Sequence, residues 1–95
     1  MVYIEKLAVT ENSLPPINKE DRIPGTIQWS DGSLPIAYNI EGSIISGFEV
    51  GKRLLVARTK RNGVEMDGLF TTSGIKEIGE DYFKTENSIY KYRFL

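Results

Sequence analysis

Apolar and polar side chains alternate along most of the chain after residue 25, and turns interrupt the alternation about every ten residues. A period of two is the spacing of a β-strand, because successive side chains point to opposite faces. The runs with this pattern are 26–29, 35–40, 43–50, 52–60, 64–72, 73–78 (a continuation or a restart of the run before it) and 82–95. About six or seven short antiparallel strands predict an all-β fold, a small SH3-like barrel or a sandwich.

Pairs of residues that end in glycine predict the turns of this sheet. Asn62-Gly63 lies between two β-rich runs and is the clearest hairpin signal, because both residues tolerate the positive φ of a tight turn. Asp31-Gly32 and Glu41-Gly42 predict two further turns. Gly68 falls inside a run, which indicates a β-bulge or the close approach of another segment.

The N-terminal part of the chain has a different pattern. Residues 2–9 alternate loosely and predict a first strand. Residues 10–24 are polar and contain three prolines, each of which lacks a backbone donor and disfavours helix in the residue before it. We therefore expect an N-terminal strand and an extended, proline-punctuated arm over 1–24, followed by a β-barrel domain over 25–95.

The composition excludes most kinds of catalytic site and metal-binding site. The chain has no histidine and no cysteine. It therefore has no Ser-His or Cys-His pair and none of the thiolate or imidazole ligands of a zinc site. Glu65 and Asp67 share a strand face as a carboxylate pair, but the alternation also places them on the solvent side. We predict a protein that is not an enzyme and that binds no metal and no cofactor.

The charge balance gives no global field toward nucleic acid or a membrane, since 12 Lys and Arg face 13 Asp and Glu. No apolar run approaches the ~18 residues of a membrane span. The N-terminal stretch carries Glu5 and Lys6 and is too short for the apolar region of a signal peptide. We expect a cytoplasmic protein with no membrane partner.

One segment departs from this balance. Residues 52–61 hold five basic side chains and no acidic one. Arginine offers phosphate a planar fork of donors, so Arg53, Arg58 and Arg61 are better phosphate candidates than Lys60. If the strands 52–60 and 89–95 are neighbours, the cations line a groove with stacking aromatics, as single-stranded nucleic acid or a nucleotide requires. The alternative is a solvated polar strand face.

Two hydroxyl-rich clusters are further candidates. The first is Thr71-Thr72-Ser73 and the second is Thr85-Glu86-Asn87-Ser88. These side chains can bind phosphate, ribose or a peptide edge, but they also bond to their own backbone at turns and bulges. The complete set of candidate ligand-binding residues is Arg53, Arg58, Lys60, Arg61, Thr71, Thr72, Ser73, Thr85, Asn87, Ser88, Tyr90 and Tyr92.

The second half of the chain carries a G-x-F-x-T-S pattern, present as Gly68-Leu69-Phe70-Thr71-Thr72-Ser73, and an F-x-T-x-N-S-x-Y pattern, present as residues 83–90. These two motifs give the chain a resemblance to a group of small β-barrel accessory proteins of bacteriophages and other mobile elements. The resemblance covers residues 36–90. It implies an accessory protein in a bacterial cytoplasm, and such proteins often disable host defences by binding an effector protein or by sequestering a nucleotide messenger.

Three hypotheses follow. The first is a non-enzymatic protein that binds and inhibits or sequesters a host defence component through its barrel surface. The second is an oligomeric binder of a phosphate-bearing nucleotide messenger, and the third is a module that binds single-stranded nucleic acid. We also expect a homo-oligomer, because Val2, Ile4 and Leu7 would be satisfied by pairing their strand with another subunit's sheet.

Overall fold

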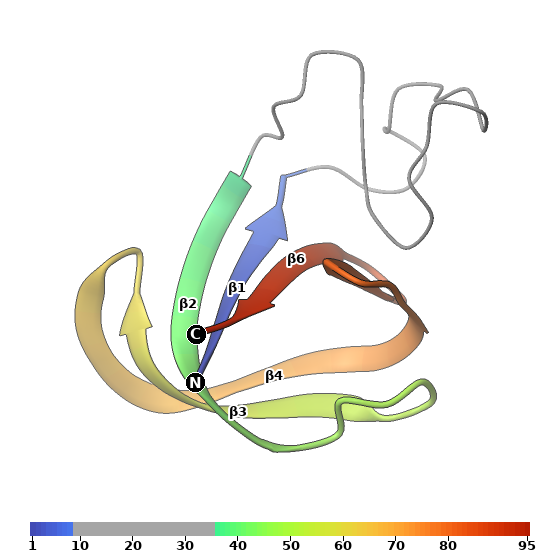
Figure 1. The fold of residues 1–95 in the computed structure, drawn as a ribbon, viewed down its shortest axis with the longest axis horizontal. Coiled ribbons are helices and arrows are strands. Elements are labelled where there is room, and N and C mark those ends of the chain that lie inside the picture. The colour runs from blue at the N-terminus through green and yellow to red at the C-terminus, as the bar shows by residue number, and fades with distance from the viewer. Residues whose placement is uncertain (9–35) are drawn as a thin grey trace.

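The structure, a computed structural model, describes residues 1–8 and 36–95. These residues form six β-strands (Figure 1): β1 Val2–Leu7, β2 Ile36–Ser46, β3 Arg53–Arg61, β4 Val64–Ile78, β5 Tyr82–Thr85 and β6 Ile89–Phe94. Each strand pairs antiparallel with the next, and β6 pairs with β1 to close a barrel. The predicted all-β barrel is confirmed.

The first strand is part of the barrel. The sequence predicts it as part of the arm, whereas β1 lies between β2 and β6, with Val2 opposite both Gly42 and Phe94. Val2, Ile4 and Leu7 are buried in the barrel interior. Their burial within the chain removes the reason given above for expecting a homo-oligomer. The predicted arm at 10–24, the strand at 26–29 and the Asp31-Gly32 turn lie outside the described residues.

The core is built by the inward half of each alternating strand. Leu54 and Val56 on β3 are fully buried, and so is Phe83 on β5. The other core members are Val2, Ile4, Ile40, Phe70, Ile75 and Tyr90. Burial of these apolar side chains is the main free-energy gain that a domain of this size has available.

Aromatic rings continue this core along the barrel interior. Phe83 and Tyr90 stack with ring centroids 4.8 Å apart and an interplanar angle of 12°. Phe70 meets Tyr90 edge to face at 6.0 Å, and Phe48 meets Tyr92 in the same way at 5.0 Å. Such pairs add to the free energy of burial, because the edge of one ring faces the electron-rich face of the next.

The predicted turn at Glu41-Gly42 is wrong, because β2 runs straight through these residues to Ser46. Gly42 is buried against β3, and a Cβ atom there would overlap the carbonyl oxygen of Ala57. The glycine therefore permits a close approach of two strands. The chain leaves β2 at Gly47 instead, which has a φ of 84°. Residues 43–50, predicted as one strand, thus span the end of β2 and the start of a loop.

The predicted hairpin at Asn62-Gly63 is confirmed. Both residues have positive φ, 51° and 80°. The Asn62 side chain accepts a hydrogen bond from the backbone N–H of Asn39 at 3.0 Å, and its own N–H donates to the Asn39 carbonyl at 2.9 Å. Residues 64–72 and 73–78 form the single strand β4 of 15 residues, and 82–95 divides into β5 and β6.

Truncation of the most deeply buried ring tests this description of the core. Phe83→Ala is expected to lower the free energy of unfolding by about 3–5 kcal/mol, because the remaining core cannot fill the cavity. Urea denaturation followed by tryptophan or tyrosine fluorescence measures the change. Leu69→Ala is the control: Leu69 is 64% exposed, and its truncation should change the free energy by less than about 0.5 kcal/mol. Equal losses in the two variants would contradict the assignment of the core.

Candidate functional site

The end of the β3–β4 hairpin is more exposed than the rest of the sheet. In this hairpin tip, residues 58–69, the β4 half curves outward (left in Figure 1), while the β3 half stays paired with β2. All residues from Lys60 to Leu69 are exposed, whereas β3 and β4 farther along contribute Val56 and Phe70 to the core. Val64 is 62% exposed and Met66 is 44% exposed. A surface with large apolar side chains on an otherwise polar ribbon is a candidate for recognition.

A β-bulge decides which side chains of the hairpin tip face inward. Gly42 lies opposite Arg58 and Ile40 lies opposite Arg61, while the register shifts by one residue between these pairs. Directly opposed residues of two strands lie on the same face, and Gly42 and Ile40 are both buried. Arg58 and Arg61 are therefore on the inner face.

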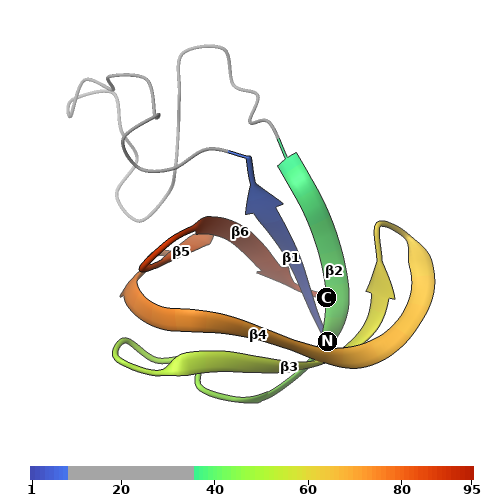
Figure 2. The same ribbon diagram turned by 180° about the vertical axis from the view of Figure 1, so that it is seen from behind.

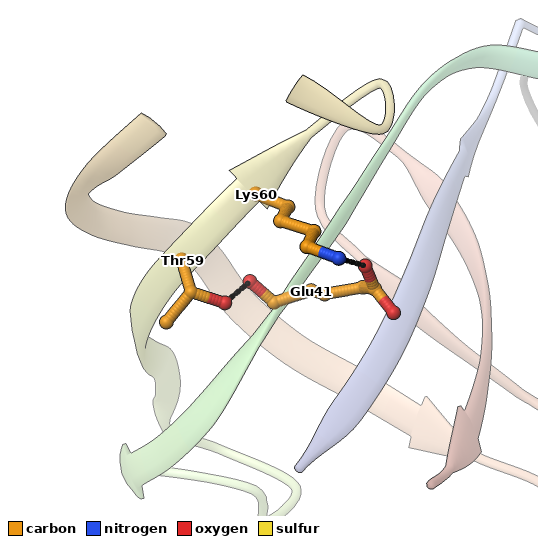
Figure 3. Close-up of polar contacts among 3 residues, drawn as sticks. All are labelled: Glu41, Thr59 and Lys60. Carbon is orange, nitrogen blue, oxygen red and sulfur yellow. Dashed lines mark hydrogen bonds and ion pairs between the residues drawn. The ribbon is translucent and has the colours of Figure 1, made fainter. Parts of the chain in front are cut away.

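The same bulge turns Lys60 to the outer face, where it meets Glu41 (Figure 3). The Lys60 Nζ lies 3.8 Å from Glu41 Oε2, and the Thr59 hydroxyl donates to the Glu41 carbonyl at 3.3 Å. An exposed ion pair of this kind stabilises a fold by at most about 1 kcal/mol. Lys60 thus has an intramolecular carboxylate partner, which makes it a weaker anion-binding candidate than its two arginine neighbours.

The inner-face cations gather around Tyr38 of β2. The Arg61 guanidinium carbon lies 5.0 Å from the centroid of the Tyr38 ring, and the Lys6 Nζ lies 5.7 Å from it. Burial raises the pKa of Tyr38, and the nearby charges of Arg61 and Arg58 oppose that rise. We call Lys6, Tyr38, Arg58 and Arg61 the Tyr38 cluster.

The cations of the Tyr38 cluster have no acidic counterpart among residues 1–8 and 36–95. The ion pairs seen there join other residues, such as Lys52 to Glu49 and Lys91 to Asp81. Cations that neighbour one another and an aromatic ring without a carboxylate produce a local positive potential. The described part of the chain, although close to neutral overall, therefore presents an anion-attracting surface at this end of the barrel.

Two arginines of the predicted set also have a structural role. The register of β3 against β4 shifts twice, between Arg58 and Lys60 and between Arg53 and Leu55. At the first shift Arg58 Nε donates to the Met66 carbonyl at 3.0 Å, and at the second Arg53 Nε donates to the Thr72 carbonyl at 3.0 Å. Each arginine thus satisfies a carbonyl that a bulge removes from the ladder.

The first hydroxyl cluster lies at the bulge between Arg53 and Leu55. Thr72 is buried; its hydroxyl accepts from the Leu54 N–H at 3.2 Å and donates to the Ser73 carbonyl at 2.8 Å. Thr71 is exposed and Ser73 is half-buried. The Thr72 hydroxyl is therefore used by its own backbone, as the structural alternative for this cluster predicts.

The second cluster forms the turn between β5 and β6. The Ser88 carbonyl accepts from the Thr85 N–H at 2.9 Å and from the Thr85 hydroxyl at 3.4 Å, while Asn87 is exposed. Tyr90 is packed inside the barrel, and the Tyr92 hydroxyl donates to the Gly79 carbonyl at 2.8 Å. The buried Tyr90 ring contacts Phe70 and Phe83, and the half-buried Tyr92 ring contacts Phe48 and Phe83.

The predicted groove between strands 52–60 and 89–95 does not form. β3 pairs with β2 and β4, whereas β6 pairs with β1 and β5. The structure therefore brings Arg58 and Arg61 together with residues outside the predicted set, namely Lys6 and Tyr38. Lys6 is opposite Tyr38 in the β1–β2 register. No local pattern reports this pairing, because the two residues are brought together only by the closure of the sheet.

A hollow lies over β1 and β6. It has a volume of about 310 Å³ and is lined by Tyr3, Glu5, Asp81, Lys91, Tyr92 and Arg93. Its charges are already matched: Tyr3 donates to Glu5 at 2.9 Å, and Lys91 lies 3.4 Å from Asp81. The Arg93 guanidinium packs over the Tyr3 ring at 4.9 Å. This hollow offers fewer free groups than the Tyr38 cluster.

Within the described ranges, no group of three or more Asp, Glu, His or Cys side chains is arranged to hold a metal ion. No helix in the same ranges is long and apolar enough to cross a membrane. Comparison with protein families, with curated proteins and with solved structures finds no match to this chain.

The electrostatic link between Tyr38 and Arg61 can be measured directly. A cation favours the charged phenolate, so Arg61→Gln should raise the pKa of Tyr38 above its value in the parent protein. Titration of the Tyr38 ring resonances by NMR, assigned with Tyr38→Phe, follows this group alone. Lys52→Gln is the control, because Lys52 pairs with Glu49 and should leave this pKa unchanged. An unchanged pKa in Arg61→Gln would exclude the contact.

Proposed function

We propose that this protein is a non-enzymatic binding module that captures an acidic protein partner, a defence component of a bacterial host, and thereby inhibits or sequesters it. The observation that carries the proposal is the Tyr38 cluster, in which Arg61 lies opposite the exposed Val64 and Arg58 is bonded to the carbonyl of the exposed Met66. A partner segment with carboxylates and apolar side chains would neutralise the first group and cover the second.

The mixture of residue types favours a protein partner. Arginine, methionine and aromatic residues are enriched at protein interfaces, where a few anchors carry most of the affinity. A phosphate-bearing ligand needs donors but gains nothing from Val64 and Met66. The assignment to a bacterial host rests on the resemblance to accessory proteins of bacteriophages and mobile elements.

The alternative of a nucleotide messenger or single-stranded nucleic acid is supported by the same cations. Base recognition by such modules usually needs aromatic rings with an open face. Tyr38 has Lys6 and Arg61 against its ring, Tyr90 is buried in the core, and Tyr92 lies at the separate hollow over β1 and β6. The alternative therefore has donors for phosphate but lacks a stacking platform at this site.

Matched baits test the proposal. The parent protein, the variant Lys6→Gln/Arg58→Gln/Arg61→Gln and the control Lys52→Gln are immobilised and exposed to bacterial lysate. A specific partner is retained by the parent and by Lys52→Gln and lost from the triple variant. With the purified partner, Arg61→Gln alone should weaken binding roughly fivefold, the ceiling for one exposed charge pair.

Three other results decide against the proposal. A rise in melting temperature with cyclic dinucleotides or mononucleotides, absent in the triple variant, would support the nucleotide alternative, since a ligand of the native state stabilises it. Binding of an oligonucleotide that weakens steeply with salt would support nucleic acid. A partner retained equally by the parent and the triple variant would remove the Tyr38 cluster from recognition.

A further inference from the structure

Among the described residues, one edge of β4 has no strand partner along more than half of the strand. β4 pairs with β3 from Val64 to Gly74, but on its other edge it pairs with β5 only from Ile75 to Ile78. Figure 2 shows the same curvature from behind: β4 runs from the hairpin tip across the barrel before it reaches β5. No described strand lies against the edge from Val64 to Ser73. Such an edge leaves alternate N–H and C=O groups available for another strand.

We infer that an extended segment of the protein partner adds to this edge as a further β-strand. The inference rests on the proposed function and specifies how the partner binds. Addition of a strand gives affinity through main-chain hydrogen bonds and gives specificity through alternate side chains on the two faces of the sheet. The unpaired edges of β2, the next longest described strand, are shorter, because β2 pairs with β1 from Ile36 to Gly42 and with β3 from Ile40 to Ser46.

Arg58 reaches this edge across β4. A Cβ atom at Gly68 would lie only 2.8 Å from Arg58 Nη2, so the guanidinium passes directly over the glycine. The hydrogen bond from Arg58 Nε to the Met66 carbonyl holds it there. The terminal nitrogens are then directed to a carboxylate on the inner face of an added strand, where a charge-assisted bond forms.

The two faces beside the edge differ in charge. On the inner face lie Val64, which is opposite Arg61, and the Arg58 guanidinium over Gly68, while Glu65, which is opposite Lys60, is on the outer face. The outer face is hollowed beside this carboxylate, with a volume of about 420 Å³ lined by Thr59, Lys60, Glu65, Met66 and Asp67. The added strand should therefore carry acidic and apolar side chains on one face and basic side chains on the other.

A second copy of this chain fits the edge less well. Antiparallel pairing of two β4 edges about Gly68 would bring the two Arg58 guanidinium groups to the same place, and like charges directly opposed are destabilising. The charge distribution thus favours a partner strand of a different sequence.

Short synthetic peptides test the inference on the intact protein. The first is capped at both ends and alternates Glu and Val on one face with Lys and Thr on the other. Two further versions keep the same side chains but carry N-methyl groups on alternate residues, one version on the odd-numbered residues and the other on the even-numbered residues. Each methylated version therefore lacks the N–H donors along one edge of the peptide strand. NMR titration should show binding of the unmethylated peptide with slowed amide exchange between Val64 and Ser73. Only one methylated version should retain binding.

Glycine variants of the protein provide a matched pair. Gly68→Ala displaces the flexible end of Arg58 and should weaken binding of the unmethylated peptide roughly fivefold. Gly74→Ala is the control, because a Cβ there meets no atom within 4 Å, and it should bind as the parent does.

The outcomes separate this inference from the proposed function. Equal binding of all three peptides, lost in Arg58→Gln/Arg61→Gln, would overturn strand addition and leave acidic recognition intact. Strand-like binding unchanged in that variant would uphold strand addition and contradict recognition by the cations. Failure of the unmethylated peptide to bind would overturn strand addition, as would a dimer of the free protein with protected β4 amides; the lysate experiment then decides the proposed function alone.

Discussion

The distribution of charged side chains over the two faces of this barrel depends on the close contact between β2 and β3. Gly42 is buried so tightly against β3 that any side chain would meet the Ala57 carbonyl. Next to it the register shifts by one residue at Thr59. A shift of one residue exchanges the faces of all later side chains. Without it, Lys60 would face inward and Arg61 outward, and the cations around Tyr38 would be dispersed over both faces.

The arginines of β3 link this constraint to the exposed hairpin tip. Bulges bend a strand and leave a carbonyl without its ladder partner. Arg58 and Arg53 each donate from Nε to such a carbonyl of β4, which holds the side chain in place while its terminal nitrogens stay available. A long side chain fixed in this way loses less conformational entropy when it binds than a free one. The same interaction therefore stabilises the curved strand and organises the candidate site.

Several elements could be predicted from the sequence because their cause is local. The period-two alternation is a property of each strand by itself, and Asn62-Gly63 needs only the positive φ that both residues adopt. The turn predicted at Glu41-Gly42 does not form. The glycine there allows the close approach of β3, which no local sequence pattern reveals. The same limit hides the site. Lys6 meets Tyr38 only through the pairing of β1 with β2. The inward direction of Arg61 follows from a bulge in the pairing of β2 with β3, and the sequence does not specify that pairing.

The near-zero net charge conceals an uneven distribution of charged side chains over the barrel. The barrel separates its charges by place: Lys60, Lys91 and Lys52 have carboxylate partners, whereas Lys6, Arg58 and Arg61 have none in the described part of the chain. Paired surface charges contribute little to stability and little to the distant field. The unpaired ones dominate the local potential within about a Debye length of 8 Å at physiological salt. In the proposed recognition of an acidic partner, the attraction is therefore short-ranged, so that complementary shape at the β4 edge, rather than long-range steering, would select among such partners.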